Sequence, residues 1–418
     1  MLTYAIKYRH VCVNAKVYNL VTKEVWSVEM NIDIEFFDVE PIENLVTCLN
    51  FKMDKVIYFG YSDDMTIDKQ KLTAKSLKNI CGVDNVEFVE ICRNNLDKIV
   101  ESVEKVIQNE YKAGNQCFFE LTGGEELELV AMGILSAKYE LPMHRFNMKT
   151  GEVQTLNENG GKRIDTLVEK RRIELSLDTI VEMHGGAIDY KEEAFSRKQL
   201  ESKEFEKDTE IMWYIAKKDN KKWNCISAVF KGCTRYEETA TRVAIWDKKL
   251  HSLANNTQGV GSYEVFKEYL DMLADAEVIK NIRKESGKLI FEYKNELIKE
   301  CIIEAGTLLE LRTFYTMKNT GKYSDCKSGV NINWDGEVGD ADDGVENEID
   351  VMLLEGYIPT FVSCKNGKVT QMALYELETV ANRFGGKYAK KILVASLGLT
   401  EGYAKRAAEM GIEVEDDI

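Results

Sequence analysis

The first third of the chain alternates between short apolar runs and longer amphipathic stretches. Apolar runs of strand length predict buried strands over Asn31–Phe37, Lys55–Gly60, Val86–Ile91, Gln116–Leu121 and Met143–Met148. Helices are expected between them, over Ile42–Phe51, Lys69–Ile80, Asn95–Tyr111 and from Gly124 to Tyr139. Strands and helices that alternate in this way predict an α/β domain with a parallel, Rossmann-like sheet.

The segments on either side of this domain differ from it. Residues 1–30 contain irregular strand signals, and two explanations stay open: an added hairpin, or an extension upstream of the native start. Residues 165–293 are more highly charged, with a helix at Ser262–Ala274 and a hairpin over Val278–Tyr293 that turns at Ser286 and Gly287. A helix followed by such a hairpin is winged-helix-like, and a plain connector domain is the alternative interpretation.

The last part of the chain predicts a second α/β domain. Its pattern indicates a long helix at Asn295–Met317, strands at Val330–Trp334, Glu348–Leu354 and Pro359–Cys364, a helix at Gln371–Arg383 and a strand at Lys391–Ala395. We therefore expect an N-terminal segment at 1–30, a first domain at 31–164, a connector at 165–293 and a second domain at 294–418.

Composition excludes several classes of protein. The 418 residues carry 55 Lys and Arg against 71 Asp and Glu, and this net charge of −16 disfavours non-specific coating of nucleic acid. The ten cysteines include no C-x-x-C pair, which disfavours a zinc ribbon or a thioredoxin-like site. No apolar run approaches 18 residues and no leader opens the chain, so we expect a cytoplasmic protein with no membrane partner.

Charged residues gather on neighbouring elements of the last domain. Glu348 and Asp350 are two apart on one strand, so both side chains leave the same face. Ser363 and Lys365 are likewise two apart at the end of the next strand, and a hairpin would bring Lys365 near Asp350. Glu310 lies in an otherwise apolar helix and could reach the same pocket. Carboxylates that bind a divalent metal beside a lysine are typical of metal-assisted phosphodiester hydrolysis.

Two other motifs give weaker signals. An acidic stretch over residues 335–350 overlaps a degenerate EF-hand pattern that starts at Asn331 and has Asp342 where a calcium loop has glutamate. We interpret it as a solvated loop beside the site. The histidines are not spaced as metal ligands, which favours core or surface roles for all four of them, His10, His144, His184 and His251.

Polar residues and glycines follow the buried strands of the first domain. Ligands of open α/β sheets bind at these carboxyl ends of the strands. Backbone N–H groups at a helix start can hold phosphate, and glycines allow a ligand to approach closely. A tight strand–helix turn without a ligand is the alternative explanation. The residues concerned are Asp38, Glu40, Tyr61, Ser62, Thr122, Gly123 and Gly124.

Three segments of the last domain together resemble the core of PD-(D/E)xK nucleases, which have a restriction-endonuclease-like fold. They run from Gly306 to Glu310, from Asn347 to Val351 and from Ser363 to Gly367. The stretch from Tyr375 to Tyr388 is similar to one branch of these enzymes, the CRISPR-associated nucleases of type III systems. These proteins join an N-terminal CARF sensor domain to the nuclease and are activated by cyclic oligoadenylates. The resemblance spans about residues 31 to 400.

The resemblance implies roles for the residues named above. Glu310 and Asp350 would bind Mn²⁺ or Mg²⁺, with Glu348 as a further ligand, and Lys365 would be the catalytic lysine. Ser363 departs from the pattern, which has Asp or Glu at that position, and a hydroxyl is a weak metal ligand. The strand ends of the sensor would bind cyclic tetra-adenylate as an allosteric activator on the axis of a homodimer. DNA or RNA would be the substrate.

Two other functions fit the same sequence. One is a constitutive restriction or junction-resolving nuclease with the same core, which would cleave without any nucleotide. The other is a nucleotide-sensing transcription regulator, which would bind duplex DNA through the winged-helix-like region and would not cleave it.

Overall fold

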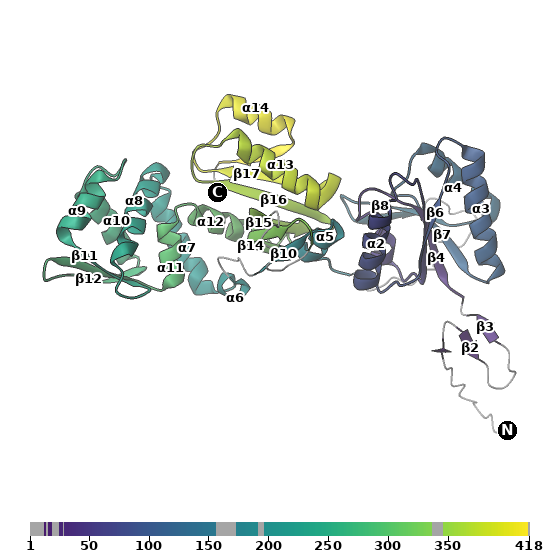
Figure 1. Cartoon of the computed structure of the whole chain (residues 1–418), viewed down its shortest axis with the longest axis horizontal. Helices are drawn as coiled ribbons and strands as arrows, with labels where there is room; N and C mark the ends of the chain where they lie inside the picture. The colour runs from purple at the N-terminus through teal and green to yellow at the C-terminus, as the bar shows by residue number, and fades with distance from the viewer. Residues whose placement is uncertain are drawn as a thin grey trace, which may run out of the picture. The chain divides into compact units, whose positions relative to one another are not determined.

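The computed structural model describes residues 12–13, 16–18, 25–27, 29–155, 173–190, 196–336 and 346–416. It confirms a mixed α/β protein, and the chain divides into two compact units, residues 1–174 and 175–418 (Figure 1). Within the described ranges, none of the helices has the length and apolar character that crossing a bilayer requires.

The first unit begins with a small antiparallel sheet. It consists of β1 (Cys12–Val13), β2 (Lys16–Tyr18) and β3 (Val25–Ser27). The strand signals in this part of the sequence are therefore confirmed as strands.

A six-stranded sheet forms the centre of the first unit, in the order β6-β5-β4-β7-β8-β9. Neighbouring strands are parallel except β9, which runs antiparallel to β8. All five predicted strands are present, because apolar runs of this length suit a parallel sheet whose two faces are both covered. The strands are β4 (Asn31–Phe36), β5 (Lys55–Gly60), β6 (Val86–Glu90), β7 (Gln116–Glu120), β8 (Met143–Asn147) and β9 (Glu152–Thr155).

Helices cover this sheet, and α3 and α4 pack together on one face of it (Figure 1). The helices are α1 (Val46–Asn50), α2 (Ile67–Ser76), α3 (Leu96–Lys112) and α4 (Glu126–Tyr139), and a π-helical turn, Leu77–Cys81, extends α2. The first helix is shorter than predicted. Asn44 exchanges two hydrogen bonds with the backbone of Asp38, of 2.8 and 2.7 Å, and so holds the chain between them as a loop.

The second unit contains a helical part with a three-stranded sheet in the order β11-β13-β12. The predicted hairpin is confirmed, and its turn residues Ser286 and Gly287 both have positive φ, as a type I′ hairpin turn requires. A helix, a strand, two helices and a hairpin follow one another, which is the succession of a winged helix. The elements are α6 (Arg197–Leu200), α7 (Lys203–Ala216), α8 (Asn220–Cys233), β11 (Arg242–Trp246), α9 (Asp247–Asn256), α10 (Tyr263–Asp275), β12 (Ile279–Glu285) and β13 (Lys288–Tyr293).

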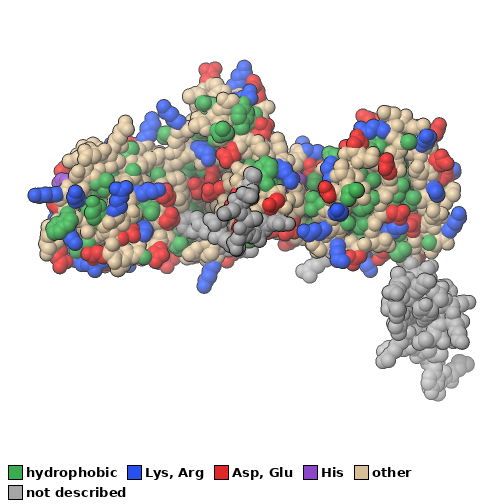
Figure 2. Space-filling model, viewed as in Figure 1, with side chains coloured by type: hydrophobic (Ala, Val, Ile, Leu, Met, Phe, Trp, Pro, Cys, Tyr) green, Lys and Arg blue, Asp and Glu red, His purple; other side chains and the backbone are tan. Residues whose placement is uncertain are grey.

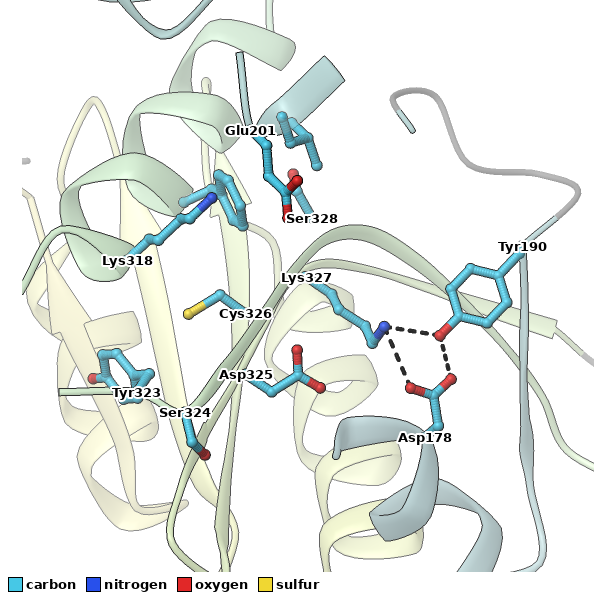
Figure 3. Close-up of a pocket in the computed structure, with 12 residues that line it drawn as sticks. Asp178, Tyr190, Glu201, Lys318, Tyr323, Ser324, Asp325, Cys326, Lys327 and Ser328 are labelled. Carbon is cyan, nitrogen blue, oxygen red and sulfur yellow. Dashed lines mark hydrogen bonds and ion pairs between the residues drawn. The ribbon is translucent and has the colours of Figure 1, made fainter. Parts of the chain in front are cut away.

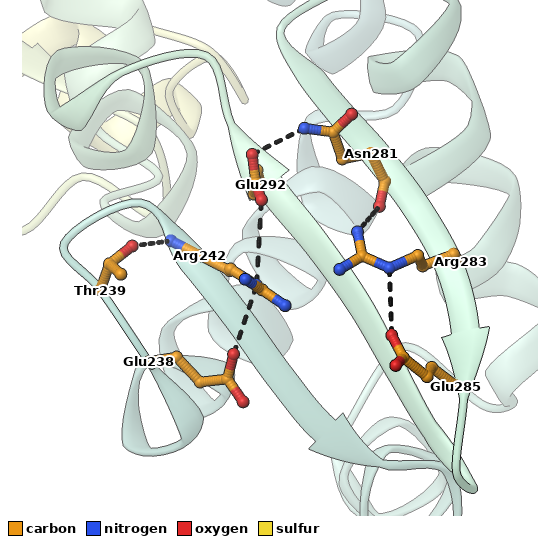
Figure 4. A network of polar contacts seen from close by, with 7 residues as sticks. All are labelled: Glu238, Thr239, Arg242, Asn281, Arg283, Glu285 and Glu292. Atoms are coloured by element: carbon orange, nitrogen blue, oxygen red, sulfur yellow. Dashed lines mark hydrogen bonds and ion pairs between the residues drawn. The ribbon is translucent and has the colours of Figure 1, made fainter.

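Charged side chains on the outer face of this three-stranded sheet neutralise one another (Figure 4). The Nε atom of Arg242 lies 3.2 Å from a carboxylate oxygen of Glu238 and 3.8 Å from one of Glu292. Across the sheet, Arg283 pairs with Glu285 at 3.3 Å. Exposed pairs of this kind contribute little to stability, so this face is a solvated surface.

A second six-stranded sheet, in the order β10-β14-β15-β16-β17-β18, occupies the rest of this unit. Neighbours from β10 to β16 are antiparallel, and β16, β17 and β18 are parallel. The strands are β10 (Ala187–Asp189), β14 (Asp325–Asn333), β15 (Glu346–Glu355), β16 (Ile358–Lys365), β17 (Lys390–Ala395) and β18 (Ile412–Glu415).

Helices α5 (Leu177–Met183), α11 (Glu296–Ile303), α12 (Thr307–Lys318), α13 (Gln371–Gly385) and α14 (Glu401–Glu409) complete the unit. The single long helix expected from Asn295 to Met317 is wrong, because the chain breaks between Ile303 and Thr307, where Glu304 is extended and Gly306 has low helix propensity. α5 and β10 precede the predicted boundary at residue 293 and yet join this sheet. A single apolar core runs from α7, α8 and α10 through α11 and α12 to strands β15, β16 and β17.

Gly385, at the end of α13, offers a test of this packing. A Cβ atom there would lie 2.5 Å from Phe361 Cε2 and 2.8 Å from Ala389 Cβ. Gly385→Ala should therefore lower the free energy of unfolding by about 1–3 kcal/mol, the usual cost of overpacking. Urea denaturation measures it. Gly402→Ala, at an open position of α14, is the control and should be neutral or stabilising by up to about 1 kcal/mol. Equal effects at both positions would contradict this packing.

Candidate functional site

The β15–β16 hairpin brings two of the candidate catalytic residues together. Strand pairing begins at Val351 and Val362, so the two strands separate at Asp350. Its Oδ2 atom accepts a hydrogen bond of 2.5 Å from the backbone N–H of Cys364. Lys365 Nζ lies 3.7 Å from the same oxygen. The proximity expected of Asp350 and Lys365 is therefore present, and their catalytic roles stay a proposal.

Glu310 reaches the same place from α12, the helix that starts after the break at residues 304–306. Burial, then the charges of Asp350 and Glu348, raises the pKa of Glu310 to about 8, and only Lys365 opposes the shift. The pKa values of Asp350 and Glu348 are raised as well, in both cases first by burial. Three carboxylates thus share one lysine, which leaves the site short of positive charge.

A divalent cation would supply the missing charge, and carboxylate oxygens are the ligands that Mg²⁺ and Mn²⁺ prefer. The donor chemistry therefore fits the expected metal. The arrangement as it stands is not a preformed cage, because no three His, Cys, Asp or Glu side chains in the described parts of the chain are placed to hold an ion. The EF-hand pattern ends at Asp342, outside the described residues, and its first part belongs to strand β14.

Ser363, the departure from the nuclease pattern, also faces this centre. Its hydroxyl is 3.2 Å from Asp350 Oδ2, so it orients that carboxylate. Sequence reasoning gave no role to Glu376 of α13, whose charge contributes to the raised pKa of Asp350 and which accepts a hydrogen bond of 3.4 Å from Asn347. A carboxylate is thus available close to Asp350 from a different element, although position 363 lacks one.

Asn366, directly after the candidate lysine, is a second residue that sequence reasoning missed. Its side-chain amide donates to Ala305 O at 2.6 Å and to Asn224 Oδ1 at 2.8 Å, and its Oδ1 accepts from Ser396 at 2.7 Å. Three segments distant in sequence therefore fix the loop that carries Lys365. Asparagine often follows a strand, so the sequence alone could not indicate that Asn366 has this bridging role.

A cavity of about 410 Å³ lies beside β14, and residues of α5, α6 and α12 also line it (Figure 3). Its polar groups satisfy one another: Lys327 Nζ donates to the Tyr190 hydroxyl at 2.8 Å and lies 3.3 Å from Asp178, which accepts from the same hydroxyl. Ser328, also at its edge, donates to the main-chain oxygen of Asp350. One wall of the cavity is therefore β14, the strand that pairs with the Asp350 strand β15.

In the first unit, the expected strand ends do lie together. β4 and β7 are parallel neighbours, and a Cβ atom on Gly123 would lie 3.1 Å from that of Asp38. Gly124 has φ +99°, so this turn requires glycine. Glu40 is buried, with its N–H bonded to Asp38 at 2.7 Å. Asp38, Gly123 and Gly124 thus share one edge of the sheet.

Tyr61 and Ser62 directly follow the neighbouring strand β5. Tyr61 is buried, Arg93 lies 4.2 Å above its ring, and burial followed by a hydrogen bond to Glu128 raises its pKa. Ser62 is exposed. Arg93, which follows strand β6 and also pairs with Asp64 at 2.5 Å, was not predicted. Its position just after β6, the third strand of this sheet along the chain, is the sequence signal that could have identified Arg93 as a candidate.

Three carboxylates, Asp33, Glu35 and Glu120, are buried beneath this edge. Burial is the largest cause that raises their pKa values, and that of Glu120 rises to about 8. Glu120 Oε1 accepts from the backbone N–H of Thr122 at 2.7 Å and also from its hydroxyl. The Thr122 side chain is therefore turned inward, toward Glu120.

The predicted core and surface roles of the histidines are confirmed for those in the described residues. His144 is buried 3.0 Å from Thr47 Oγ1, and burial lowers its pKa to about 3, so it is neutral. His184 is buried at the end of α5, and His251 stacks on Tyr263. His10 lies outside the described residues.

Comparison with known proteins gives structural relatives alone. No family model matches the chain, and neither does any curated protein sequence. The chain is similar to the crystal structure of protein VC1899 from Vibrio cholerae, with 18% identity, a TM-score of 0.69, and coverage of 93% of this chain and 94% of that one. It is also similar to Can2 from Sulfobacillus thermosulfidooxidans in complex with cyclic tetra-adenylate, with 14% identity, a TM-score of 0.60, and coverage of 92% and 93%. Over nearly its whole length, the chain therefore shares its fold with these two proteins.

Proposed function

We propose that this chain is a divalent-metal-dependent nuclease of type III CRISPR defence that a cyclic oligoadenylate activates. The first unit is the CARF sensor and the second contains the PD-(D/E)xK nuclease. The observation that carries the proposal is the convergence of Glu310, Asp350 and Lys365 from one helix and two strands. The full-length similarity to Can2, solved with cyclic tetra-adenylate, supports this ring as the activator.

In the nuclease, Glu310, Asp350 and Glu348 hold Mn²⁺ or Mg²⁺, which when bound acts as a Lewis acid and makes water more acidic. Lys365 orients the attacking water and offsets the charge of the scissile phosphate. The Cys364 N–H fixes the carboxylate of Asp350, so its free oxygen keeps one direction. DNA or RNA is the substrate.

In the sensor, the activator offers phosphates, ribose hydroxyls and adenine amino groups. The phosphates suit the backbone N–H groups of Gly123 and Gly124 and the guanidinium of Arg93. The hydroxyl and amino groups are donors, and Asp38 and Ser62 are the acceptors at the same edge. Glu120 positions the turn from below through its hydrogen bonds to Thr122.

We propose that the homodimer forms through an exposed apolar face of α4. Leu127, Val130 and Ile134 of α4 are 37%, 48% and 45% exposed, and their spacing puts them on one side of the helix. The Thr122–Gly124 turn leads directly into α4. A two-fold axis at this apolar face would therefore place two turns around one shared ring.

The transcription regulator is disfavoured by the charge of α10. In a helix-turn-helix, the second helix enters the major groove and meets phosphates on both sides. The exposed charged residues of α10 are four acids and one lysine: Glu264, Lys267, Glu268, Asp271 and Asp275. Lys267 is already paired with Asp271. An acidic second helix repels a duplex.

A nuclease assay tests the catalytic residues. With Mn²⁺ and cyclic tetra-adenylate, Asp350→Ala and Lys365→Ala should each cleave at least about 100-fold more slowly than wild type, the usual loss for one positioned group. Activator binding should be unchanged, because the sensor is a separate unit. Lys368→Ala, at an exposed position in the same loop, is the matched control and should cleave normally. Normal cleavage by Asp350→Ala contradicts the site, and cleavage without any nucleotide supports the constitutive nuclease.

Calorimetry tests the sensor. Wild type should bind about one ring per dimer, because a ligand on the axis is shared. Gly124→Val should weaken binding at least about tenfold, since a Cβ at φ +99° is strained and crowds Phe36 and Glu128. Gly82→Ala is the control, because it introduces the same kind of strain at φ +69° in open space. Two independent sites per dimer, or normal binding by Gly124→Val, would place the activator elsewhere.

The buried acids predict a pH dependence of stability. A carboxyl group whose pKa is raised from 4.5 to about 8 in the folded protein holds its proton there while the unfolded chain has lost it. Stability should therefore fall as pH rises from about 4.5 to about 8. In scanning calorimetry, Glu120→Gln should reduce the drop in Tm between pH 5 and pH 8 by at least about 4 °C, or about 1 kcal/mol. Exposed Glu101→Gln should leave the drop unchanged. An identical drop in Glu120→Gln would refute the shift.

A further inference from the structure

A basic corner between α7 and α8 stands out on this acidic chain. We define it by Tyr214, Lys217, Lys218 and Lys221. Residues 217–222, which contain three of these lysines, also include Asp219 and Lys222. This stretch of six residues thus has four lysines and one carboxylate, in a protein whose net charge is −16. Figure 2 shows Lys and Arg side chains projecting from the part of the unit that contains α7 and α8.

Charges at this corner are not neutralised locally. Lys217, Lys218 and Lys221 are exposed, and among the described residues none of the three forms an ion pair. Asp219 caps α8 by accepting from the backbone N–H of Lys222 at 2.9 Å. On the outer face of the three-stranded sheet, in contrast, Arg242 and Arg283 are both paired with carboxylates (Figure 4).

An exposed aromatic ring lies among these lysines. Tyr214, in the last turn of α7, is 63% exposed, and Lys218 Nζ is 5.1 Å from the centre of its ring. Lys217 and Lys218 follow Tyr214 by three and four residues, which puts all three side chains on one side. An aromatic face flanked by lysines is the combination that binds single-stranded nucleic acid, because an unpaired base stacks on the ring while phosphates meet the cations.

Hydrogen bonds connect this corner to the candidate catalytic centre. Asn224, three residues after Lys221 on α8, donates to Asn366 O at 2.6 Å and accepts from Asn366 Nδ2 at 2.8 Å. Asn366 directly follows Lys365. The corner and the loop of the catalytic lysine are therefore held in one fixed arrangement within the core of the second unit.

We propose that the corner of Tyr214, Lys217, Lys218 and Lys221 binds the substrate as a single strand and leads it to the centre at Asp350 and Lys365. The inference rests on the proposed nuclease function and adds to it the strand state of the substrate and its path. Tyr214 stacks with an unpaired base, and the three lysines contact successive phosphates. A duplex offers no unpaired base to the ring, and the acidic α10 does not attract it.

Binding can be measured without cleavage, so the test does not depend on the nuclease being active. The probe is a fluorescein-labelled 20-nucleotide oligo(dT), titrated with the full chain in EDTA and followed by anisotropy at several salt concentrations. Lys217→Gln/Lys218→Gln/Lys221→Gln should weaken binding at least about tenfold at low salt. It should also reduce the slope of log K against log salt by about 2, since each contact to a single strand contributes about 0.7. Tyr214→Ala should weaken binding about tenfold.

The end of β11 in the same unit, with the neighbouring start of β13, provides a matched control. Trp246 is 51% exposed with Lys288 Nζ 5.2 Å from its ring, and Lys248 and Lys249 follow it. Trp246→Ala and Lys248→Gln/Lys249→Gln/Lys288→Gln make the same chemical changes without a link to Asn366, and should bind within about twofold of wild type. Thermal unfolding verifies that every variant is folded.

Several outcomes would overturn the proposal. Wild-type affinity in the corner variants, or equal losses in the corner variants and in the Trp246 and Lys248/Lys249/Lys288 variants, would show that the corner has no special role. Tighter binding of a 20-base-pair duplex than of oligo(dT) would exclude the single-strand path. Displacement of oligo(dT) by an equal charge concentration of polyglutamate would indicate an acidic protein partner instead. If wild type binds oligo(dT) through the corner and yet never cleaves with Mn²⁺ and cyclic tetra-adenylate, the nuclease assignment fails and the binding surface stands.

Discussion

Strands β15 and β16 separate at Asp350, and the candidate centre depends on this separation. Beyond Val351 and Val362 the two strands no longer exchange backbone hydrogen bonds. There the carboxylate of Asp350 accepts a hydrogen bond from the backbone N–H of Cys364. A buried N–H needs an acceptor, and this bond acts together with the pairing of Lys365 and Ala395 between β16 and β17 to hold the end of β16 in place. Glu310 can enter the gap from α12 because the helix before it ends at Ile303. The carboxylate of Asp350 therefore helps to position Lys365, while Glu310 is positioned by α12.

Both units hold carboxylates together with too few cations. In the second unit Glu310, Asp350 and Glu348 share Lys365, and in the first Asp33, Glu35 and Glu120 are buried under the strand ends. Packing alone would favour apolar residues at such positions, because buried carboxyl groups that are not paired cost stability. Strongly shifted pKa values at the edges where ligands bind are the usual mark of functional positions. In each unit one of these acids accepts a backbone N–H: Asp350 accepts that of Cys364, and Glu120 accepts that of Thr122.

A shared core joins the helical part of the second unit to its six-stranded sheet. Apolar residues of α7, α8 and α10 pack in one cluster with those of α12 and of strands β15 to β17. On the polar side of this contact, Asn224 and Asn366 exchange two hydrogen bonds. A connector between two domains would not need such a contact. The proposed substrate path depends on this contact.

The sequence by itself determined most of the elements and the identity of the chemical groups. Apolar runs predicted five of the six strands in the central sheet of the first unit and missed only β9, and the hairpin turn at Ser286 and Gly287 followed from local preference, since both signals depend on neighbours in sequence. The pairing of Asp350 with Lys365 was predictable because one hairpin joins them. The tertiary structure alone decided the break before Thr307, the inward turn of Thr122 to Glu120, and the packing of Tyr61 under Arg93. It also decided the bonds of Asn366 to residues 61 and 142 positions away. These features depend on which distant groups become buried together, and local patterns of polarity carry no information about that.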